Sequence, residues 1–342
     1  MSDKPLIPRR VRRRLRKDVE SRREREYRPA AREGLPRRVT IREVGPRDGL
    51  QSEKPLSVDE RATLITDLSR TGIPKIEAVS FVSPMAVPAM ADAAEVWARV
   101  ERKPGVRYSA LVPNARGARA ALAAGGFASL QAFVAASDGY NRHNLGKPVT
   151  ESIEDVGAVV AEARQTAVAV ECSISSAFGD PFDGDVAPDQ AIDVAQRLVD
   201  VGVVGISFGD TTGMATPSRV WDLVEQYRKR LSQVRLNLHF HDTRGTAMAN
   251  VLAALEMGCD EFDASIGGIG GSPFAPGAGG NVATEDLVHM LMDMGIETGV
   301  TSLVGLLDVS GFLQDALGHP LRSGVVEAGP RWSVSAPLER PD

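Results

Sequence analysis

The chain has 342 residues, of which 43% are apolar, and a formal net charge of -5. That length accommodates one large domain or two smaller ones, with enough apolar side chains for a substantial core. No apolar run approaches the roughly 18 residues that span a membrane, so we expect a soluble protein. Two cysteines, Cys172 and Cys259, make no disulfide framework and suit a reducing compartment. We therefore expect a cytoplasmic location.

Charge is distributed unevenly along the chain. Residues 1–38 hold 15 Lys and Arg against 6 Asp and Glu, a balance of +9, whereas the remainder has a balance of -14. This basic segment has few apolar side chains and cannot bury enough surface to offset the entropy of ordering it. We expect residues 1–38 to be a disordered, solvated arm. Weak contacts of the arm with nucleic acid or with a neighbouring subunit are the alternative.

From residue 39 onward, short β-rich runs alternate with Ala-rich segments of helical period, a pattern typical of parallel βαβ units. Eight strands are predicted, at residues 39–44, 75–81, 107–112, 130–135, 168–174, 205–209, 235–241 and 261–266. Eight helices are predicted between and after them, at residues 58–71, 91–101, 115–124, 153–166, 188–201, 217–232, 247–257 and 284–294. This order predicts a single (β/α)8, or TIM, barrel over residues 39–320. One or two short helices are expected after residue 301, followed by a polar tail over residues 321–342.

Two histidines lie two residues apart at the end of the seventh predicted strand, in the sequence N-L-H-F-H-D-T-R-G. Alternate strand residues point to the same side, so His239 and His241 project together. Imidazoles that converge in this way suit a metal ion, although one or both could instead be core histidines. Nitrogen and oxygen ligands without a thiolate favour Mg or Mn, while histidine pairs also bind Zn, Co and Fe.

In a TIM barrel the chemistry lies at the carboxyl ends of the strands. The exit of the first strand, G-P-R-D-G-L-Q, contains Arg47 and Asp48. Asp48 can bind a cation while Arg47 donates to an oxygen that becomes negative, but the two could also form a local ion pair that closes the turn. Polar residues that follow other strands are expected to contact the substrate: Asn114, Ser137 and Thr211.

Two carboxylates, Glu77 and Asp210, lie in or directly after predicted strands. An unpaired carboxylate is costly to bury there. We therefore expect them to pair with Arg47 or to contact the substrate.

The segment after the eighth strand, residues 267–281, reads G-G-I-G-G-S-P-F-A-P-G-A-G-G-N. Its glycines let the backbone approach a ligand closely, and a mobile lid over the barrel mouth is a common use of such a loop. A flexible loop without a function is the alternative. Asn281 ends this loop and opens an acidic helix.

Five motifs of the chain resemble those of the 3-hydroxy-3-methylglutaryl-CoA (HMG-CoA) lyase family, which shares a metal-dependent barrel superfamily with isopropylmalate and homocitrate synthases. In order and with matching spacing over about residues 39–318, they are V-G-P-R-D-G-L-Q, E-A-V-S-F-V-S-P, I-S-F-G-D-T-T-G, H-F-H-D-T-R-G and the glycine-rich loop with N-V-A-T-E-D-L-V. The resemblance implies four ligands for a divalent cation: Asp48, His239, His241 and Asn281. It also implies that Arg47 steadies the enolate of the departing thioester, with Glu77 and Asp210 as supporting carboxylates and Gln51 at the substrate.

One position departs from the family pattern. The family's loop carries a cysteine that is credited with acid/base work, and this chain has Ser272 there. A thiol titrates near 8.5 and a serine hydroxyl does not titrate near neutrality, so the two are not equivalent as proton shuttles.

The expected function is cleavage of an acyl-CoA by a metal-dependent carbon–carbon lyase. The favoured substrate is HMG-CoA, which gives acetoacetate and acetyl-CoA, and citramalyl-CoA, which gives pyruvate, is the runner-up because of Ser272. A homo-oligomer, either a dimer or a tetramer, is expected. An inactive barrel that binds nucleic acid or a partner through its Arg-rich arm is the alternative from another class.

Overall fold

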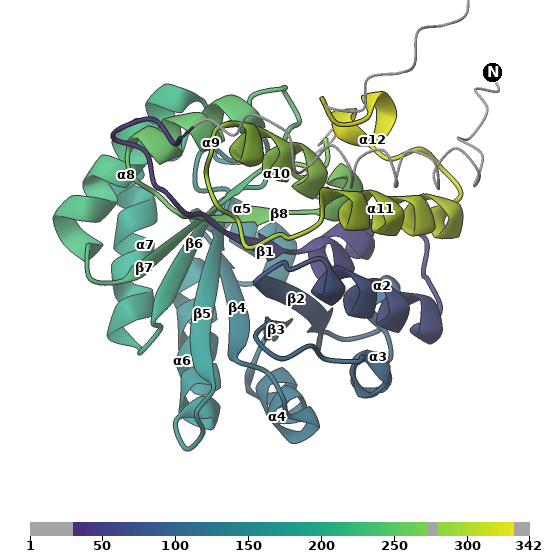
Figure 1. The fold of residues 1–342 in the computed structure, drawn as a ribbon. Helices are drawn as coiled ribbons and strands as arrows, with labels where there is room; N and C mark the ends of the chain where they lie inside the picture. The colour runs from purple at the N-terminus through teal and green to yellow at the C-terminus, as the bar shows by residue number, and fades with distance from the viewer. Residues whose placement is uncertain (1–29, 272–278, 332–342) are drawn as a thin grey trace, which may run out of the picture.

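The computed structural model describes residues 30–271 and 279–331. Eight parallel strands close into a barrel in which each strand pairs with its neighbours in chain order, and β1 also pairs with β8. Helices surround these strands (Figure 1). The predicted (β/α)8 barrel is confirmed.

The eight strands lie within about two residues of their predicted limits. They are β1 (Thr40–Glu43), β2 (Lys75–Ser80), β3 (Arg107–Leu111), β4 (Ser129–Ala135), β5 (Ala169–Ser175), β6 (Gly205–Asp210), β7 (Arg235–Phe240) and β8 (Glu261–Ala264). The parallel register places Gly209 beside His239 and His239 beside Asp263. The carboxyl ends of the strands therefore meet at one mouth of the barrel.

The predicted helices are present with small shifts in their limits: α2 (Val58–Arg70), α3 (Ala93–Arg99), α4 (Ala115–Ala124), α6 (Val149–Ala163), α7 (Pro188–Asp200), α8 (Pro217–Leu231), α9 (Ala247–Glu256) and α10 (Thr284–Asp293). Local sequence sets their ends. Ser57 and Glu60 form a capping box at the start of α2. Gly72, which follows this helix, has a positive φ of 91° that suits glycine.

One short helix, α5 (Asp138–Leu145), was not expected from the sequence. Its residues D-G-Y-N-R-H-N-L have little apolar periodicity, which hid it. Ser137 accepts a hydrogen bond from the Tyr140 amide at the start of this helix, and Gly146 ends it with a φ of 73°. Capping residues thus define a helix that the hydrophobic pattern does not show.

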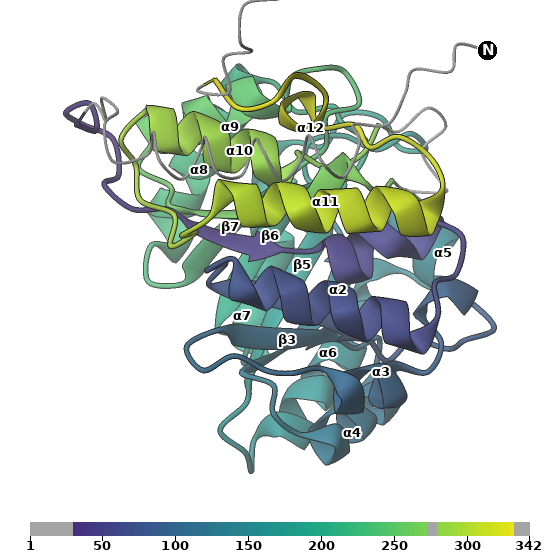
Figure 2. The same ribbon diagram turned by 45° about the vertical axis from the view of Figure 1, so that its right-hand side comes forward.

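Within the part of the chain that the structure describes, two helices follow the barrel: α11 (Leu303–Leu317) and α12 (Gly324–Ala328). The first has 15 residues and packs against α2 and α10, covering this side of the barrel (Figure 2). The second lies within the segment predicted as a tail. Asp286 on α10 accepts hydrogen bonds from the amides of Gly324 and Val325 at 2.9 and 2.8 Å, so the start of this segment is held to the fold.

Part of the barrel interior is polar. Arg42 on β1 donates from Nε and Nη2 to the carboxylate of Asp263 on β8, at 2.7 and 2.8 Å, and from Nη1 to Gln131 at 2.7 Å. Arg235 donates to Glu171 at 2.6 Å, and this carboxylate is also 3.5 Å from Arg42. These charged side chains, which come from four different strands, are therefore paired rather than left isolated.

The residues just before β1 pair with the segment that follows α10. The amide of Glu297 donates to the carbonyl of Arg37 at 3.0 Å, and that of Val39 donates to the carbonyl of Glu297 at 2.7 Å. The end of the segment predicted as an arm therefore pairs with the barrel, while residues 1–29 lie outside the described part of the chain. Among the described residues, no helix is long and apolar enough to cross a membrane.

Candidate metal and active site

A group of potential metal ligands gathers at the carboxyl ends of the strands. Asp48 lies in the turn after β1, while His239 and His241 lie at the end of β7. Donor atoms of these three residues all lie within 4.8 Å of one another. Asn281 joins them because it forms an isolated bridge with His241. The tertiary fold thus brings together all four predicted ligands.

The turn that carries Asp48, η1 (Gly45–Gly49), is tightly wound. The carbonyl of Val44 accepts hydrogen bonds from the amides of Arg47, Asp48 and Gly49 at 3.1, 2.7 and 3.1 Å. A Cβ added at Gly45 would lie 2.6 Å from the Oε1 atom of Glu43, so only glycine fits there. The G-P-R-D-G sequence therefore packs the turn closely enough to direct Asp48 at the histidines.

The spacing of the donor atoms fits a single cation. Two ligand atoms at about 2.1 Å from one ion lie roughly 3.0 Å apart at a right angle and roughly 4.2 Å apart on opposite sides. The Nε2 atoms of His239 and His241 are 3.0 Å apart, and Asp48 Oδ2 is 4.0 Å from His239 Nε2. Both separations lie within the range that one ion sets.

Asn281 supplies a further observation. Its Nδ2 donates to Asp48 Oδ2 at 2.8 Å and to the carbonyl of Ile269 at 3.0 Å. Its Oδ1 is buried and accepts no hydrogen bond from the described residues. A buried carbonyl oxygen without a donor is costly, and a cation is a partner that removes the cost.

The charges around the site favour a carboxylate at Asp48. Burial opposes its ionisation, but Arg47 and then His239 outweigh burial and lower the pKa of Asp48 to about 2. Burial, together with His239, lowers the pKa of His241 to about 4. Near neutral pH the site therefore offers an ionised carboxylate and a neutral imidazole, the forms that bind metals.

Arg47 is held beside these ligands. Its Nε donates to Glu77 on β2, and its Nη1 donates to Asp48 Oδ1 at 2.8 Å. Gln51 also donates to Asp48 Oδ1, at 2.9 Å. The predicted pairing of Glu77 with Arg47 is therefore present. Gln51 contacts the site through its hydrogen bond to Asp48.

Asp210 has different surroundings from those of Glu77. It is fully buried at the end of β6, where Oδ1 accepts from the amide of Ala215 at 2.8 Å, and Oδ2 accepts no hydrogen bond from the described residues. Burial raises its pKa to about 7. No hydrogen bond joins it to Arg47 in the described structure, and its contact with substrate stays a prediction.

The three polar residues expected to contact substrate have local hydrogen bonds. Asn114 accepts from the amide of Gly117 and caps α4, and Ser137 caps α5 and donates to Asp180. Thr211 accepts from the amide of Ser176 at 3.1 Å. Each contact with substrate stays a prediction. Ser272 lies outside the described residues.

The sequence did not indicate Asp263, which contacts His239. Its Oδ2 lies 3.0 Å from His239 Nδ1. Asp263 is flanked by the buried apolar residues Phe262 and Ala264 in E-F-D-A, and Arg42 lies between the buried residues Ile41 and Glu43 in T-I-R-E. A charged residue at an inward position of each of two neighbouring barrel strands was the signal that could have indicated the pair.

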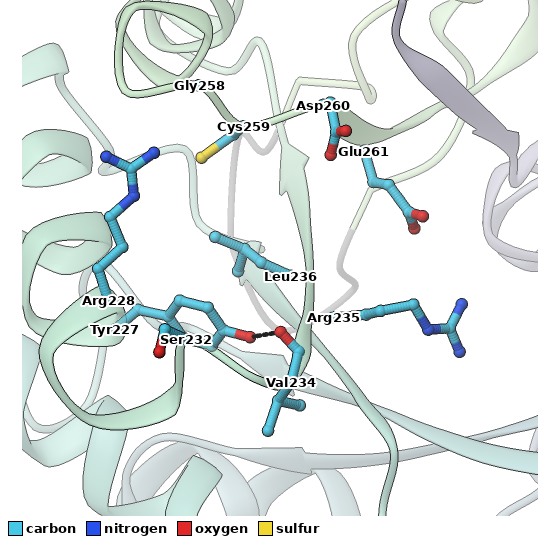
Figure 3. A pocket seen from close by; sticks show the side chains of 10 residues that line it. All are labelled: Tyr227, Arg228, Ser232, Val234, Arg235, Leu236, Gly258, Cys259, Asp260 and Glu261. Carbon is cyan, nitrogen blue, oxygen red and sulfur yellow. Dashed lines mark hydrogen bonds between the residues drawn. The ribbon is translucent and has the colours of Figure 1, made fainter. Parts of the chain in front are cut away.

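A cavity of about 510 Å³ lies at the other end of the barrel, where α8 ends and β7 and β8 begin (Figure 3). Leu236 and Cys259 form part of its wall, with Arg228 and Tyr227 across from them. None of the predicted site residues lines it. Because catalysis in this fold occurs at the carboxyl ends of the strands, this cavity is not the active site.

The closed parallel barrel with a His-x-His pair and an aspartate at its mouth defines a class, the TIM barrels with a candidate metal site at the carboxyl ends of their strands. A family model described as HMGL-like matches residues 38–311, and the chain belongs to this family. The family assignment and the assignment as a carbon–carbon lyase, both expected from the motifs, are confirmed.

Similar proteins and solved structures support the same family assignment. The chain is 43% identical over 289 residues to hydroxymethylglutaryl-CoA lyase YngG of Bacillus subtilis, a match that covers 84% of this chain and 96% of that protein. It is 42% identical to the cytoplasmic 3-hydroxy-3-methylglutaryl-CoA lyase of Rattus norvegicus over 296 residues, 86% of each chain. An HMG-CoA lyase structure from Acinetobacter baumannii, in complex with coenzyme A and 3-methylmalate, has a TM-score of 0.84 at 37% identity and covers 87% of this chain and 97% of its own.

Proposed function

We propose that the protein cleaves HMG-CoA to acetoacetate and acetyl-CoA as a metal-dependent acyl-CoA lyase. The observation that carries this proposal is the convergence of Asp48, His239, His241 and Asn281 at the barrel mouth, with spacings that suit one cation. The HMG-CoA lyases among the relatives support the choice of substrate.

The residues present fit a divalent cation with oxygen and nitrogen ligands, and we propose Mg or Mn. A bound cation supplies Lewis acidity, which makes the tertiary hydroxyl of the substrate easier to deprotonate. Asp48 brings the negative charge, His241 brings a neutral imidazole, and Asn281 offers its unpaired Oδ1. Despite burial, Asp263 and Asp48 raise the pKa of His239, which brings the second nitrogen once its Nε2 is unprotonated. Four protein ligands leave room for oxygens of the substrate.

Arg47 stabilises the negative charge that develops when the C2–C3 bond breaks. Two of its nitrogens are committed to Glu77 and Asp48, and Nη2 has no partner among the described residues. Nη2 can therefore donate to the thioester oxygen as it becomes an enolate oxygen. A guanidinium already oriented by two carboxylates needs little rearrangement to do so.

Asp210 is the proposed group for moving a proton. Its Oδ2 is buried and free of hydrogen bonds from the described residues, and its pKa lies near 7. A carboxyl group with a pKa close to the working pH can accept the hydroxyl proton of the substrate and return it. Ser272 is the second proposed proton carrier, at the carbon that becomes the methyl group of acetyl-CoA.

The proposed setting is a cytoplasmic homo-oligomer. Cytoplasmic and mitochondrial forms both occur among the relatives, and the two buried free cysteines, Cys172 and Cys259, suit a reducing compartment.

Acetyl-CoA release by the purified full-length chain tests the proposal. The protein is stripped with a chelator, then assayed with HMG-CoA before and after addition of Mg or Mn, with citramalyl-CoA in parallel. Release that depends on the metal and is faster with HMG-CoA is the expected result. Faster cleavage of citramalyl-CoA assigns the other substrate, and no release from either compound refutes the lyase function.

A further inference from the structure

Asp263 on β8 receives four hydrogen bonds, which use both of its carboxylate oxygens. Arg42 Nε and Asn237 Nδ2 donate to Oδ1 at 2.7 and 2.9 Å, and Arg42 Nη2 donates to Oδ2 at 2.8 Å. The fourth partner is His239 Nδ1, which lies 3.0 Å from Oδ2. Asp263 is 4% exposed, so solvent hardly competes for these bonds.

This arrangement places a proton of His239 on Nδ1. A guanidinium is always protonated, so the bidentate pair with Arg42 keeps Asp263 an ionised carboxylate that can only accept. The hydrogen bond to His239 therefore needs the proton on Nδ1. The Nε2 atom of a neutral His239 is then left with its lone pair, and it is this atom that faces His241.

The second imidazole is oriented by the same rule. His241 Nδ1 lies 3.3 Å from the carbonyl oxygen of Gly279, which can only accept. Two Nε2 lone pairs thus face each other across 3.0 Å, an arrangement that disfavours a hydrogen bond between the rings and favours a shared cation.

We propose that Asp263, held by Arg42, is the positioning residue that keeps the His239 proton on Nδ1 and so presents Nε2 to the divalent cation. The proposal rests on the proposed metal site. It adds a requirement that the ligands alone do not impose, because His239 binds a cation only when its Nε2 is unprotonated.

The network that holds Arg42 makes this orientation firm. Gln131 accepts from Nη1 at 2.7 Å, and Glu171 lies 3.5 Å from the same nitrogen. Residues from β4, β5 and β8 thereby hold the guanidinium of Arg42, which is 5% exposed. Glu171→Gln removes a charge from this network but leaves the shorter bonds of Arg42 to Asp263 and Gln131 in place and does not touch His239, which makes it the matched control.

The test substitutes Asp263→Asn, which keeps the size of the side chain. When the amide oxygen faces Arg42 Nε, the amide nitrogen faces His239 Nδ1 as a donor, so the imidazole proton must move to Nε2. The same exchange next to a catalytic histidine in serine proteases leaves the geometry intact and reverses the tautomer. We expect Mn affinity, measured by electron paramagnetic resonance on metal-free protein, to fall roughly 10- to 100-fold. Glu171→Gln should stay within about 3-fold of the parent.

Nitrogen-15 NMR of the metal-free protein, recorded at alkaline pH where the histidine rings are neutral, reads the tautomer directly. The parent should carry the His239 proton on Nδ1, and Asp263→Asn should carry it on Nε2. A proton on Nε2 in the parent overturns the proposal even if the variant does not fold. Unchanged Mn affinity in Asp263→Asn, or an equal loss in Glu171→Gln, overturns it as well. A parent that binds no Mn instead refutes the proposed metal site.

Discussion

The carboxylate of Glu77 on β2 holds the guanidinium of Arg47, which lies in the turn after β1. Glu77 is fully buried, and its Oε2 atom accepts no hydrogen bond from the described residues. Arg47 is therefore anchored at Nε by a buried carboxylate, while its Nη1 donates to Asp48 at the barrel mouth.

This anchoring predicts the effects of two substitutions. Arg47→Met should lower kcat by about 10² to 10³, because the developing enolate loses a positioned donor. Glu77→Gln should lower kcat less and leave Mn affinity within a few-fold of the parent, because it disturbs the orientation of Arg47 and touches no ligand. Steady-state kinetics with a metal titration measures both. A Glu77→Gln enzyme with parental kcat shows that the pair does not position Arg47.

His239→Ala removes one proposed ligand. The variant should keep the far-ultraviolet circular dichroism of the parent, because His239 is a partly buried residue at the barrel mouth and not part of the apolar core. It should lose metal-dependent cleavage of HMG-CoA. The comparison is made after chelation and re-addition of Mg or Mn. Equal turnover by variant and parent shows that His239 is not a ligand of the metal.

Ser272→Cys should accelerate the lyase. Loss of positioned acid/base help typically costs about 10² to 10⁴ in rate, and a thiol restores a group that titrates near neutrality. The variant should also become sensitive to alkylation. The parent should resist the reagent, because Cys172 and Cys259 are buried and burial raises the pKa of Cys259 to about 12.

No gain in rate from Ser272→Cys, combined with efficient cleavage of another 3-hydroxyacyl-CoA by the parent, assigns the serine to a different substrate.

Two truncations separate the arm from the barrel. Removal of residues 1–29 should leave kinetics within a few-fold of the parent. Removal of residues 1–38 also deletes the Arg37 carbonyl that accepts from Glu297 and the packing of Leu35 on the core. We expect it to cost about 1–2 kcal/mol, or several °C in Tm. Thermal melts and kinetics of both proteins measure this. Loss of activity on removal of residues 1–29 alone shows that the arm is needed for catalysis.

Glu285 predicts a dependence of stability on pH. Burial raises its pKa to about 8, and its carboxyl group bonds the amide of Gly267 and the hydroxyl of Ser310. The folded state therefore holds the proton more tightly than the unfolded chain, in which a glutamate titrates near 4.3. The stabilisation from this group is complete below that value and is lost as pH rises toward 8.

Glu285→Gln cannot lose a proton. The Tm of this metal-free variant should therefore fall less than that of the parent between pH 5 and pH 8. Glu256→Gln, at an exposed position of α9, should follow the parent curve. Parallel curves for Glu285→Gln and the parent show that Glu285 is ionised throughout that range.

Sequence alone determined the barrel and the position of the site within it. Runs of β-rich and helical residues alternate eight times, which leaves few ways to bury their apolar faces other than a closed parallel barrel. Strand periodicity also places His239 and His241 on one side, and the motif at Asp48 follows the first strand. These features are local, because they depend on residues within a few positions of one another.

Tertiary structure decided what those residues contact. Asp263 and Arg42 are 221 positions apart, and Asn281 and Asp48 are 233 apart, so neither contact follows from residues that are neighbours in the sequence. Closure of the barrel between β1 and β8 brings them together. The fold also gives different partners to the two carboxylates for which the sequence predicted the same roles. Glu77 binds Arg47 from the neighbouring strand, whereas Asp210 is buried and accepts from the amide of Ala215. The physical reason is that a side chain's partners depend on strand order and register, which are properties of the whole sheet.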